Sequence, residues 1–317
     1  MNRLPPFVVL FGPTAAGKTT MVQALHRAFV SSGGIELISA DSAQVYRGMD
    51  IGTAKPPRSM RADFSHHLID IRDPDEPFTA GDFVSLSEAA LRGAASRGAL
   101  PVVAGGTAFY IRSLLYGLPE VPAADPWIRR QLEEELVRRG TEALRTELEA
   151  VDPASASRIS PADRYRLVRA LEVFRSTGRP RSSFKVPDTL RPDIHVCCIA
   201  LDLPRAELYD RINRRVEHML DEGLESEVRS LIRAGYGPRD PGMRAIGYRE
   251  FLSQSSDSGV EVLPAQEVAA TIQRNTRRYA KRQITFFRSF ECAEWMSAGE
   301  PPAIISRISE FLAAAPD

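Results

Sequence analysis

The sequence predicts an α/β protein whose core is a parallel sheet with helices on both faces, interrupted by an inserted all-helical domain. Three observations support this fold class. Short apolar runs alternate with amphipathic stretches between residues 7 and 118, which is typical of parallel strands joined by crossover helices. Residues 127–178 then contain no convincing strand. Strand character returns only at His195–Leu201.

The first expected strand, Phe7–Phe11, ends in the pattern Gly-x-x-x-x-Gly-Lys-Thr and leads into an expected helix. This context is that of a phosphate-binding P-loop. Successive backbone N–H groups and the helix N-terminus attract an anion, and Lys18 adds a full positive charge. The Thr19 hydroxyl is a suitable ligand for Mg²⁺. The loop itself does not identify the phosphate compound that it binds. Its residues are Gly12, Pro13, Thr14, Ala15, Ala16, Gly17, Lys18 and Thr19.

The next expected strand, Leu37–Asp41, ends in an acid, and a long loop rich in polar residues, glycine and proline follows it. Phe78–Arg97 has the apolar spacing of a helix. A strand that starts at Pro101 then runs into a glycine turn. Ligands bind at the carboxyl ends of parallel strands. We therefore expect three segments to surround one pocket: Gly12–Thr19, Asp41–Tyr46 and Gly105–Thr107.

A proline-rich stretch, Leu118–Pro126, marks the start of the insertion. We place the core domain at residues 1–121 and 195–317 and the helical insertion at residues 122–194. The insertion is rich in arginine, but acidic residues nearly balance the arginines, so most of it predicts a mixed solvated surface. Its expected helices are Ile128–Arg139, Glu142–Glu149 and Arg164–Ser176.

The last third of the chain contains its strongest local charge asymmetry. Between Ala269 and Phe290 there are six cations and no acidic residue, whereas Ile272, Tyr279 and Phe287 form an apolar stripe. Such a face favours a polyanionic partner over simple solvation. The cations are Arg274, Arg277, Arg278, Lys281, Arg282 and Arg288. We also expect a helix over Leu208–Ala234, a turn and helix at Arg244–Arg249, and a strand and helix within Glu291–Asp317.

Composition limits the possible classes of protein. Lys and Arg total 41 and Asp and Glu total 41, so the overall charge gives no indication of a nucleic-acid partner. The three cysteines lack metal-ligand spacing, which predicts a reducing compartment without disulfides or a zinc finger. The N-terminus has no secretory signal, and no apolar run approaches the ~18 residues of a membrane span. We expect a cytoplasmic monomer with no membrane partner.

The pocket chemistry leaves alternatives open. Asp41 is either an acid that organises Mg²⁺ or a general base beside the phosphates. Thr107 either hydrogen-bonds the reacting group or caps a helix. Group transfer from a phosphorylated donor to a nucleic acid is one function class, and a small-molecule kinase with the insertion as a lid is another. A nucleotide-switched RNA-binding module would not need an acid at Asp41. The surplus cations of residues 269–290 favour the first class.

Together these residues resemble one family closely, the bacterial tRNA dimethylallyltransferases of the IPP transferase family, which prenylate adenosine 37 beside the anticodon. The resemblance runs from Gly12 to Arg288 in family order, and the Asp-Ser and Asp-Ile-Gly-Thr-Ala-Lys-Pro sequences within Asp41–Pro56 are specific to it. Ala16 and Ala43 depart from the commoner family residues without removing a reacting group. The other matching stretches are Gly12–Thr19, His66–Pro74, Gly105–Thr107, Arg166–Phe174, Ile246–Tyr248 and Lys281–Thr285.

The resemblance implies that dimethylallyl diphosphate is the donor and Mg²⁺ the cofactor. The P-loop would hold the diphosphate, which is the leaving group, through its N–H groups, Lys18 and Mg²⁺ on Thr19. Arg215 would complete this anion site. The N6 amine of adenosine would attack the allylic carbon while Asp41 removes its proton and Thr107 orients it.

The resemblance also implies that the insertion grips the tRNA anticodon stem-loop and that adenosine 37 is pulled out of its stack. The alternative within the resemblance is a prenyltransferase for free adenine nucleotides, which would not need the large insertion. The implied tRNA contacts are Asp41, Ser42, Ala43, Gln44, Thr107, Arg129, Tyr165, Arg166, Leu167, Val168, Arg169, Arg244, Ala245, Ile246, Gly247, Tyr248, Arg249, Lys281, Arg282 and Arg288.

Overall fold

The computed structural model describes residues 3–122, 125–255 and 259–314. The chain forms two compact units. The core unit comprises residues 1–115 and 191–317, and the helical unit comprises residues 116–190. The predicted boundaries were 121/122 and 194/195, so both observed boundaries fall a few residues earlier in the chain.

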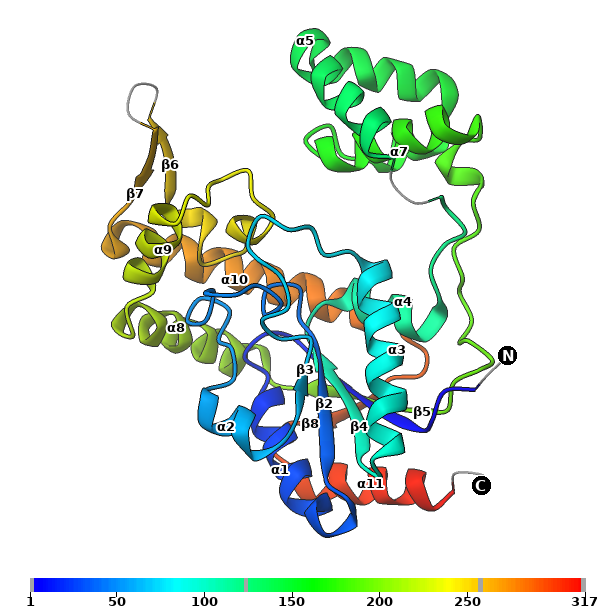
Figure 1. Ribbon diagram of the computed structural model, residues 1–317, viewed down its shortest axis with the longest axis vertical. Helices are drawn as coiled ribbons and strands as arrows, with labels where there is room; N and C mark the ends of the chain where they lie inside the picture. Colours follow the sequence, from blue (N-terminus) through cyan, green and yellow to red (C-terminus); the bar gives the residue numbers. More distant parts are fainter. Residues whose placement is uncertain (1–2, 123–124, 256–258, 315–317) are drawn as a thin grey trace. The chain divides into compact units, whose positions relative to one another are not determined.

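The core unit is built on a six-stranded parallel sheet in which the P-loop strand β1 lies between β4 and β5 (Figure 1). Each neighbouring pair of strands is parallel, as the alternating sequence predicts. In spatial order the strands are β3 (His66–His67), β2 (Ile35–Ala40), β4 (Leu100–Gly105), β1 (Phe7–Phe11), β5 (Val196–Asp202) and β8 (Glu294–Ser297).

Both faces of the sheet are buried, which explains why the central strands are continuous apolar runs. Val8 and Leu10 join an apolar cluster with side chains of two helices, α1 and α11. Phe11 points to the other face and packs on Phe287 of α10 with ring centroids 4.8 Å apart. The prediction of helices on both faces is confirmed. Helices of this unit include α1 (Lys18–Phe29), η1 (Val30–Ser32), α2 (Arg58–Asp63), α3 (Ala80–Ser96), α4 (Ala108–Tyr116), α10 (Ala265–Phe287) and α11 (Pro301–Ala313).

The carboxyl ends of β2 and β4 approach each other very closely. A Cβ atom at Gly105 would lie 2.1 Å from the carbonyl oxygen of Ala40, so this position has no space for a side chain. The backbone N–H of Thr107 donates to the same Ala40 oxygen at 3.0 Å. The glycine turn after β4 is therefore locked onto the end of β2, beside Asp41.

Two predictions for the last third are wrong in detail. The expected helix over residues 208–234 is two helices, α8 (Arg205–Asp221) and α9 (Leu224–Arg233), because Gly223 has a positive φ of 97° and breaks it. Residues 242–251 form two single 3₁₀ turns, η3 (Gly242–Arg244) and η4 (Arg249–Phe251), instead of a turn and a helix. A small antiparallel hairpin then follows, made of β6 (Leu252–Ser255) and β7 (Gly259–Val262), which the sequence analysis did not anticipate.

The helical unit has its own apolar core, so its helices do not depend on a neighbouring sheet for burial. Leu132, Leu144, Leu148 and Leu171 are all buried in one cluster. The three predicted helices are confirmed, with the first two joined across a kink where Gly140 has a φ of 80°. Its elements are α5 (Pro126–Val151), α6 (Pro153–Arg158), α7 (Arg164–Thr177) and η2 (Arg181–Ser183).

Charges on the helical unit are extensively paired, as the mixed composition predicts. Arg175 donates to both Glu135 and Glu147, at 2.8 and 2.6 Å. These bonds hold the pKa of Glu135 well below its usual range, at about 2. Glu172 is fully buried and accepts from the Arg169 guanidinium at 2.8 Å. Buried carboxylates of this kind need such partners because an unpaired buried charge is costly.

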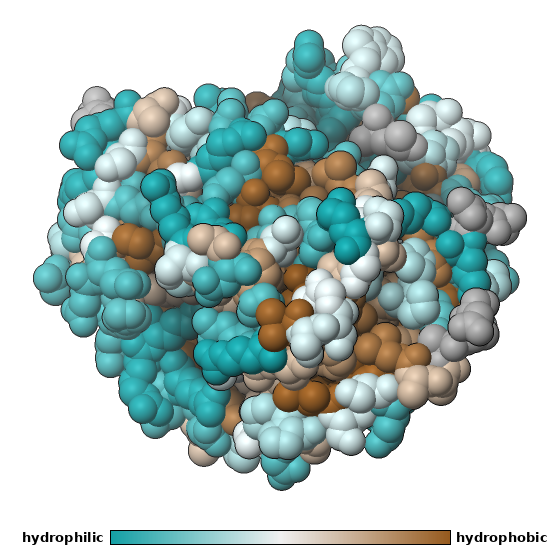
Figure 2. Space-filling model, turned by 60° about the horizontal axis from the view of Figure 1, so that its bottom comes forward, coloured by the Kyte–Doolittle hydropathy of each residue, from teal (hydrophilic) through white to brown (hydrophobic). Residues whose placement is uncertain are grey.

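No helix in the described ranges combines the length and apolar character that spanning a membrane requires. On the face shown in Figure 2, hydrophobic residues occur in small groups among hydrophilic ones. This distribution agrees with the balanced composition, since apolar atoms always cover part of a folded protein's surface.

The packing of α10 on the sheet predicts that two neighbouring phenylalanines contribute differently to the free energy of unfolding. Phe287 is fully buried against Phe11, so Phe287→Ala should lower the free energy of unfolding by about 3–5 kcal/mol. Its neighbour Phe286 is 38% exposed, and Phe286→Ala should cost less than about 1 kcal/mol. Urea denaturation of both variants measures the difference. Equal losses would show that this packing does not hold α10 on the sheet.

Candidate active site

A cavity of about 550 Å³ lies in the core unit at the carboxyl ends of the central strands. The three segments expected to share one pocket all contribute to its wall, so this prediction is confirmed. The P-loop contributes Thr14, Ala15, Gly17, Lys18 and Thr19; the loop after β2 contributes Asp41, Ser42, Ala43, Gln44, Gly52, Thr53 and Ala54; Gly106 follows β4; α8 contributes Arg215, Val216 and Met219; residues 244–249 contribute Arg244, Ala245, Ile246, Gly247 and Arg249; and α10 contributes Ile272, Thr276, Tyr279, Arg282 and Gln283.

Lys18 lies inside the P-loop, where its ammonium group donates to two loop carbonyls. The distances are 3.0 Å to the oxygen of Gly12 and 2.8 Å to that of Pro13. The pKa of Lys18 is lowered to about 8. Burial is the largest cause, the nearby Arg215 charge adds to the shift, and the Asp41 charge opposes it. The amine therefore lies near its titration point at neutral to mildly basic pH, and a bound anion would favour its charged form.

Gln283 of α10 fixes the P-loop from the opposite side. Its side-chain oxygen accepts the Thr14 N–H at 2.9 Å, and its amide nitrogen donates to the Gly106 carbonyl at 2.7 Å. The side chain is only 4% exposed. A single buried amide thus joins the loops that follow β1 and β4, and it occupies one N–H that the sequence assigned to the anion.

Asp41 stands at the end of β2, and its carboxylate shapes the loop that follows. Its Oδ1 atom accepts the N–H groups of Ala43 and Gln44, at 2.9 and 3.4 Å. Thr107 lies across from this loop, and its hydroxyl oxygen accepts the Ser42 N–H at 2.9 Å. Thr107 therefore joins the Asp41 loop to the turn after β4, as expected for residues that serve one site.

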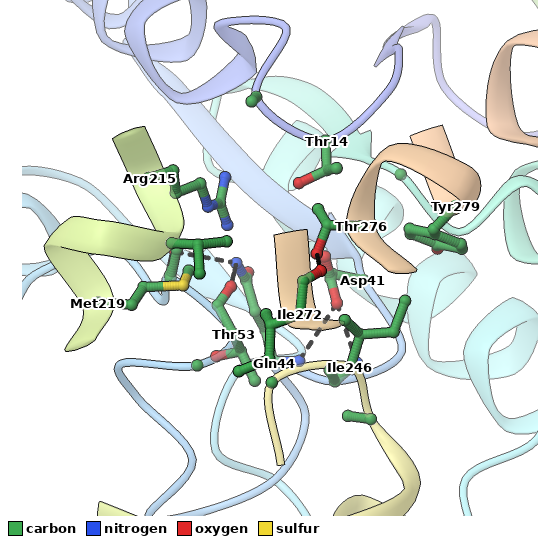
Figure 3. Close-up of a pocket in the computed structure, with 18 of the residues that line it drawn as sticks. Thr14, Asp41, Gln44, Thr53, Arg215, Met219, Ile246, Ile272, Thr276 and Tyr279 are labelled. Carbon is green, nitrogen blue, oxygen red and sulfur yellow. Dashed lines mark hydrogen bonds between the residues drawn. The ribbon is translucent and has the colours of Figure 1, made fainter. Parts of the chain in front are cut away.

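Arg215 brings a second cation to the cavity. Figure 3 shows Arg215 and Met219 projecting from α8 toward the space that Thr14 and Asp41 also face. Burial lowers the pKa of Arg215, and the charge of Asp41 opposes that shift. Of the three arginines on this part of α8, Arg211 and Arg214 are instead paired with Glu207 and Asp210. The structure therefore selects Arg215, the residue singled out by the resemblance.

One wall of the cavity is apolar. Val216 and Met219 from α8, Ile272 from α10 and Ile246 contribute to it, and all four pack in or against the same buried cluster (Figure 3). A wall of this kind suits a hydrocarbon group and offers few hydrogen-bond partners to a sugar or a phosphate. The cavity therefore combines two cations, a carboxylate and an apolar surface.

Comparison with known proteins decides the family. The family model described as IPP transferase matches residues 44–290. The chain is 43% identical to tRNA dimethylallyltransferase 1 of Trichlorobacter lovleyi over 95% of this chain and 96% of that protein. It is 44% identical to tRNA dimethylallyltransferase of Geobacter sulfurreducens, over 95% and 94%. The chain belongs to the IPP transferase family.

Solved structures of this family have the same fold. The full-length tRNA isopentenylpyrophosphate transferase of Bacillus halodurans is 35% identical, with a TM-score of 0.66 over 97% of both chains. A second solved structure is that of a eukaryotic dimethylallyltransferase acting on tRNA. It superposes with a TM-score of 0.78 at 24% identity, over 98% of this chain and 80% of that one. The second likeness concerns the fold alone.

Not every residue expected at an IPP transferase site faces the cavity. Gly12, Pro13 and Ala16 are buried and do not line it, so their part is to hold the loop and Lys18. In the helical unit, Leu167 and Val168 are each 3% exposed because they pack in its apolar core. Side-chain contacts of these two residues with tRNA are therefore excluded in this conformation.

Tyr248 is a further correction to the expected tRNA contacts. Its ring is fully buried, and its hydroxyl donates to Glu227 at 2.6 Å. Burial and the Glu227 charge raise the pKa of Tyr248 well above its usual value. The residue supports the wall of the cavity from behind instead of facing RNA.

The basic surface of α10 is partly as predicted. Arg274, Arg278 and Lys281 are exposed, and Arg282 reaches the cavity wall. Arg288 is also exposed, just after the end of α10. Arg277 departs from the expected pattern because it is half-buried and donates to Asn213.

Sequence reasoning missed several cavity residues on α10, among them Tyr279 and Gln283. Tyr279 was assigned to the apolar stripe, but it faces the cavity, where burial and the Asp41 charge raise its pKa to about 12. Gln283 was noted only as part of a matching stretch. The spacing of residues 272, 276, 279 and 283 is that of one helix face, and the three polar side chains on it, at 276, 279 and 283, were the available signal.

The lowered pKa of Lys18 predicts a pH dependence of anion binding. If the ammonium form of Lys18 is the form that binds diphosphate, the advantage of Lys18 over Met should shrink above pH ~8, by up to about tenfold per pH unit. Calorimetric binding of inorganic diphosphate to the unmodified protein and to Lys18→Met, from pH 7 to 9.5, measures this ratio. The Lys18→Met variant shows how much of the pH dependence comes from protonation of diphosphate itself. A ratio that stays constant over this range would remove Lys18 from the anion site.

Proposed function

We propose that the protein transfers the dimethylallyl group of dimethylallyl diphosphate to N6 of adenosine 37 in tRNA, giving N6-isopentenyladenosine and diphosphate. The observation that carries the proposal is one cavity that joins Lys18 and Arg215, the Asp41 carboxylate and an apolar wall. The names of the relatives, which are tRNA dimethylallyltransferases, support the choice of donor and acceptor.

The donor end of the reaction needs positive charge. Breaking the bond between the allylic carbon and oxygen leaves the electron pair on diphosphate, so negative charge grows there in the transition state. Lys18, Arg215 and the first N–H groups of α1, which have no carbonyl partner within the helix, are positioned to stabilise it. These groups are held in place before the reaction, which makes their interaction with the growing charge effective.

The acceptor end needs a base. The N6 nitrogen forms the new bond to the allylic carbon and loses one proton, which the Asp41 carboxylate accepts. The apolar wall holds the hydrocarbon group of the donor between the two ends. Thr107 accepts the Ser42 N–H and so holds the loop after Asp41 in place, and it would help to orient the amine.

The donor set at the anion site fits Mg²⁺ bound mainly through phosphate. In the described part of the chain no three His, Cys, Asp or Glu residues cluster as a metal site. Mg²⁺ commonly uses one or two protein oxygens together with substrate phosphates and water, and Thr19 on the cavity wall can provide one. When bound, the ion would neutralise charge on the diphosphate.

Both units carry groups that suit an RNA acceptor. On α10, Arg278 and Lys281 are exposed near Arg282 of the cavity wall. In the helical unit the guanidinium of Arg129 lies over the exposed Tyr165 ring, 4.9 Å from its centroid. Phosphate contacts by arginine and lysine and stacking by aromatic rings are the usual means of holding an RNA loop. Such contacts would offset the few kcal/mol needed to extrude the target base.

The function is tested directly with labelled dimethylallyl diphosphate. We expect label to enter bulk tRNA, with no transfer to AMP and no turnover of ATP. Transfer to AMP in preference to tRNA would favour the free-nucleotide prenyltransferase, and ATP turnover would favour a kinase. Label in neither nucleic acid nor nucleotide would reject the proposed reaction.

Asp41→Asn should lower the single-turnover rate of tRNA prenylation by about 10²–10⁴-fold, the range for losing a general base. The substitution keeps an oxygen that can accept the N–H groups of Ala43 and Gln44, so the loop should remain in place. Binding of tRNA, measured by filter retention, should change little. A rate within threefold of the unmodified protein would assign Asp41 to a structural or metal-organising role.

Replacing Arg278 and Arg282 together by Ala should weaken tRNA binding and flatten its dependence on salt by about two units of slope. The control replaces Arg214 and Arg233, two arginines on α8 and α9 that do not line the cavity. Filter binding of both double variants between 50 and about 200 mM salt compares the slopes. Identical slopes in the test and control variants would show that the α10 surface is merely solvated.

A further inference from the structure

Glu227 is bound by three consecutive backbone N–H groups from a distant segment of the chain. It projects from the first turn of α9, and its carboxylate oxygens accept the N–H groups of Asp50 at 2.9 Å, Ile51 at 2.9 Å and Gly52 at 3.3 Å. Successive N–H groups that converge on one point form a concave anion site. Here the anion is a side chain of the protein itself.

The same carboxylate also holds a second segment of the cavity wall, which lies beside the first. The Tyr248 hydroxyl donates to Glu227 at 2.6 Å, and the buried Tyr248 ring lies against Gly52 so closely that a Cβ atom there would be 2.5 Å from it. Gly247, beside Tyr248, packs on the backbone of Gly52 as well. Glu227 therefore connects the segment around Gly52 with the segment around Gly247, both of which line the cavity.

The segment held by Glu227 leads on to the residues beside the reacting groups. The carbonyls of Thr53 and Ala54 accept the side-chain amide of Gln44, both at 3.3 Å. The oxygen of the Gln44 amide accepts the Ser39 hydroxyl at 3.0 Å, and the Gln44 backbone N–H donates to Asp41 at 3.4 Å. Hydrogen bonds joined by short stretches of backbone thus connect Glu227, which does not line the cavity, with Asp41, which does.

We propose that Glu227 is a positioning residue that fixes one wall of the cavity relative to Asp41; this wall, formed by the segments around Gly52 and Gly247, is named the acceptor wall. This inference rests on the proposed transfer reaction for its effect on turnover, but its structural part does not. Glu227 contacts none of the P-loop residues in the bonds described, and Gln283 fixes the P-loop separately. Loss of Glu227 should therefore disturb the acceptor end of the site and leave the anion end intact.

A carboxylate suits this position better than its amide. Each oxygen of Glu227 accepts from more than one donor, and the bonds from Ile51 reach both oxygens, at 3.2 and 2.9 Å. In Glu227→Gln an NH₂ group would replace one oxygen and face N–H donors, leaving some of them unpaired. Charge-assisted bonds would also be lost. A displacement of the wall by about 1 Å is enough to lower the rate of an aligned reaction by up to 10²-fold.

The experiment compares Glu227→Gln with Glu225→Gln. Glu225 lies in the same turn of α9 and also accepts a backbone N–H, that of Ala265 at 2.9 Å, but it does not line or support the acceptor wall. We expect Glu227→Gln to lower the single-turnover rate at saturating tRNA at least tenfold while the Kd of inorganic diphosphate changes less than twofold. Hydrogen exchange should accelerate at residues 50–52. Glu225→Gln should keep its rate within twofold.

Two results would overturn the inference: a Glu227→Gln rate within twofold of the unmodified protein, or parallel losses of rate and diphosphate binding in both variants. If Glu227→Gln fails to fold, Tyr248→Phe decides, because it removes one bond to Glu227 and keeps the buried ring. It should lower the rate severalfold with unchanged diphosphate binding, and an unchanged rate would reject the inference. If the unmodified protein prenylates no tRNA, the proposed function fails, whereas hydrogen exchange at residues 50–52 still tests the positioning role.

Discussion

Two cations that line the same cavity, Lys18 and Arg215, are the constraint on which the rest of the site depends. Burial lowers the pKa of Lys18, the Arg215 charge adds to that shift, and the Asp41 carboxylate counteracts part of it. Three parts of the chain must converge to produce this arrangement: the P-loop after β1, the end of β2 and the middle of α8. The parallel sheet brings the first two together because successive carboxyl ends lie on one edge. Helix α8 packs against α10 and brings the third part, which carries Arg215.

Helix α10 shows how one element can serve three purposes at once. Phe287 packs into the core against Phe11, and Gln283 holds the P-loop and the turn after β4. Arg278 lies on the exposed surface. The apolar, polar and basic positions follow the helical period, so each face of α10 meets a different environment. A change on one face therefore need not disturb the others.

The parts of this protein that depend on local chemistry could be predicted from the sequence. The strand, loop and helix around Gly12–Thr19, the strands that precede Asp41 and Gly106, and the α7 helix all follow from short-range patterns, and the structure contains each of them. Tyr248 could not be assigned in this way, because the apolar side chains around its ring and its hydrogen-bond partner Glu227 come from other parts of the chain. Tyr279 was placed with the apolar stripe for a related reason: periodicity gives the face of a helix but not what that face meets.

The two ends of the cavity are held by different physical means, and this explains why one end was easier to predict. At the anion end the backbone itself forms the site, so the glycines and the lysine appear together in the sequence. At the acceptor end, Glu227 and Glu250 hold loops from outside the cavity, and Glu250 accepts the Gly247 N–H at 2.8 Å and an Asn275 amide at 2.8 Å. The backbone partners of Glu227 lie far from it in the sequence, at residues 50–52, so no local spacing marks this carboxylate. A wall supported in this way can vary its inner residues while its position stays fixed, which suits the part of the site that has to recognise a base.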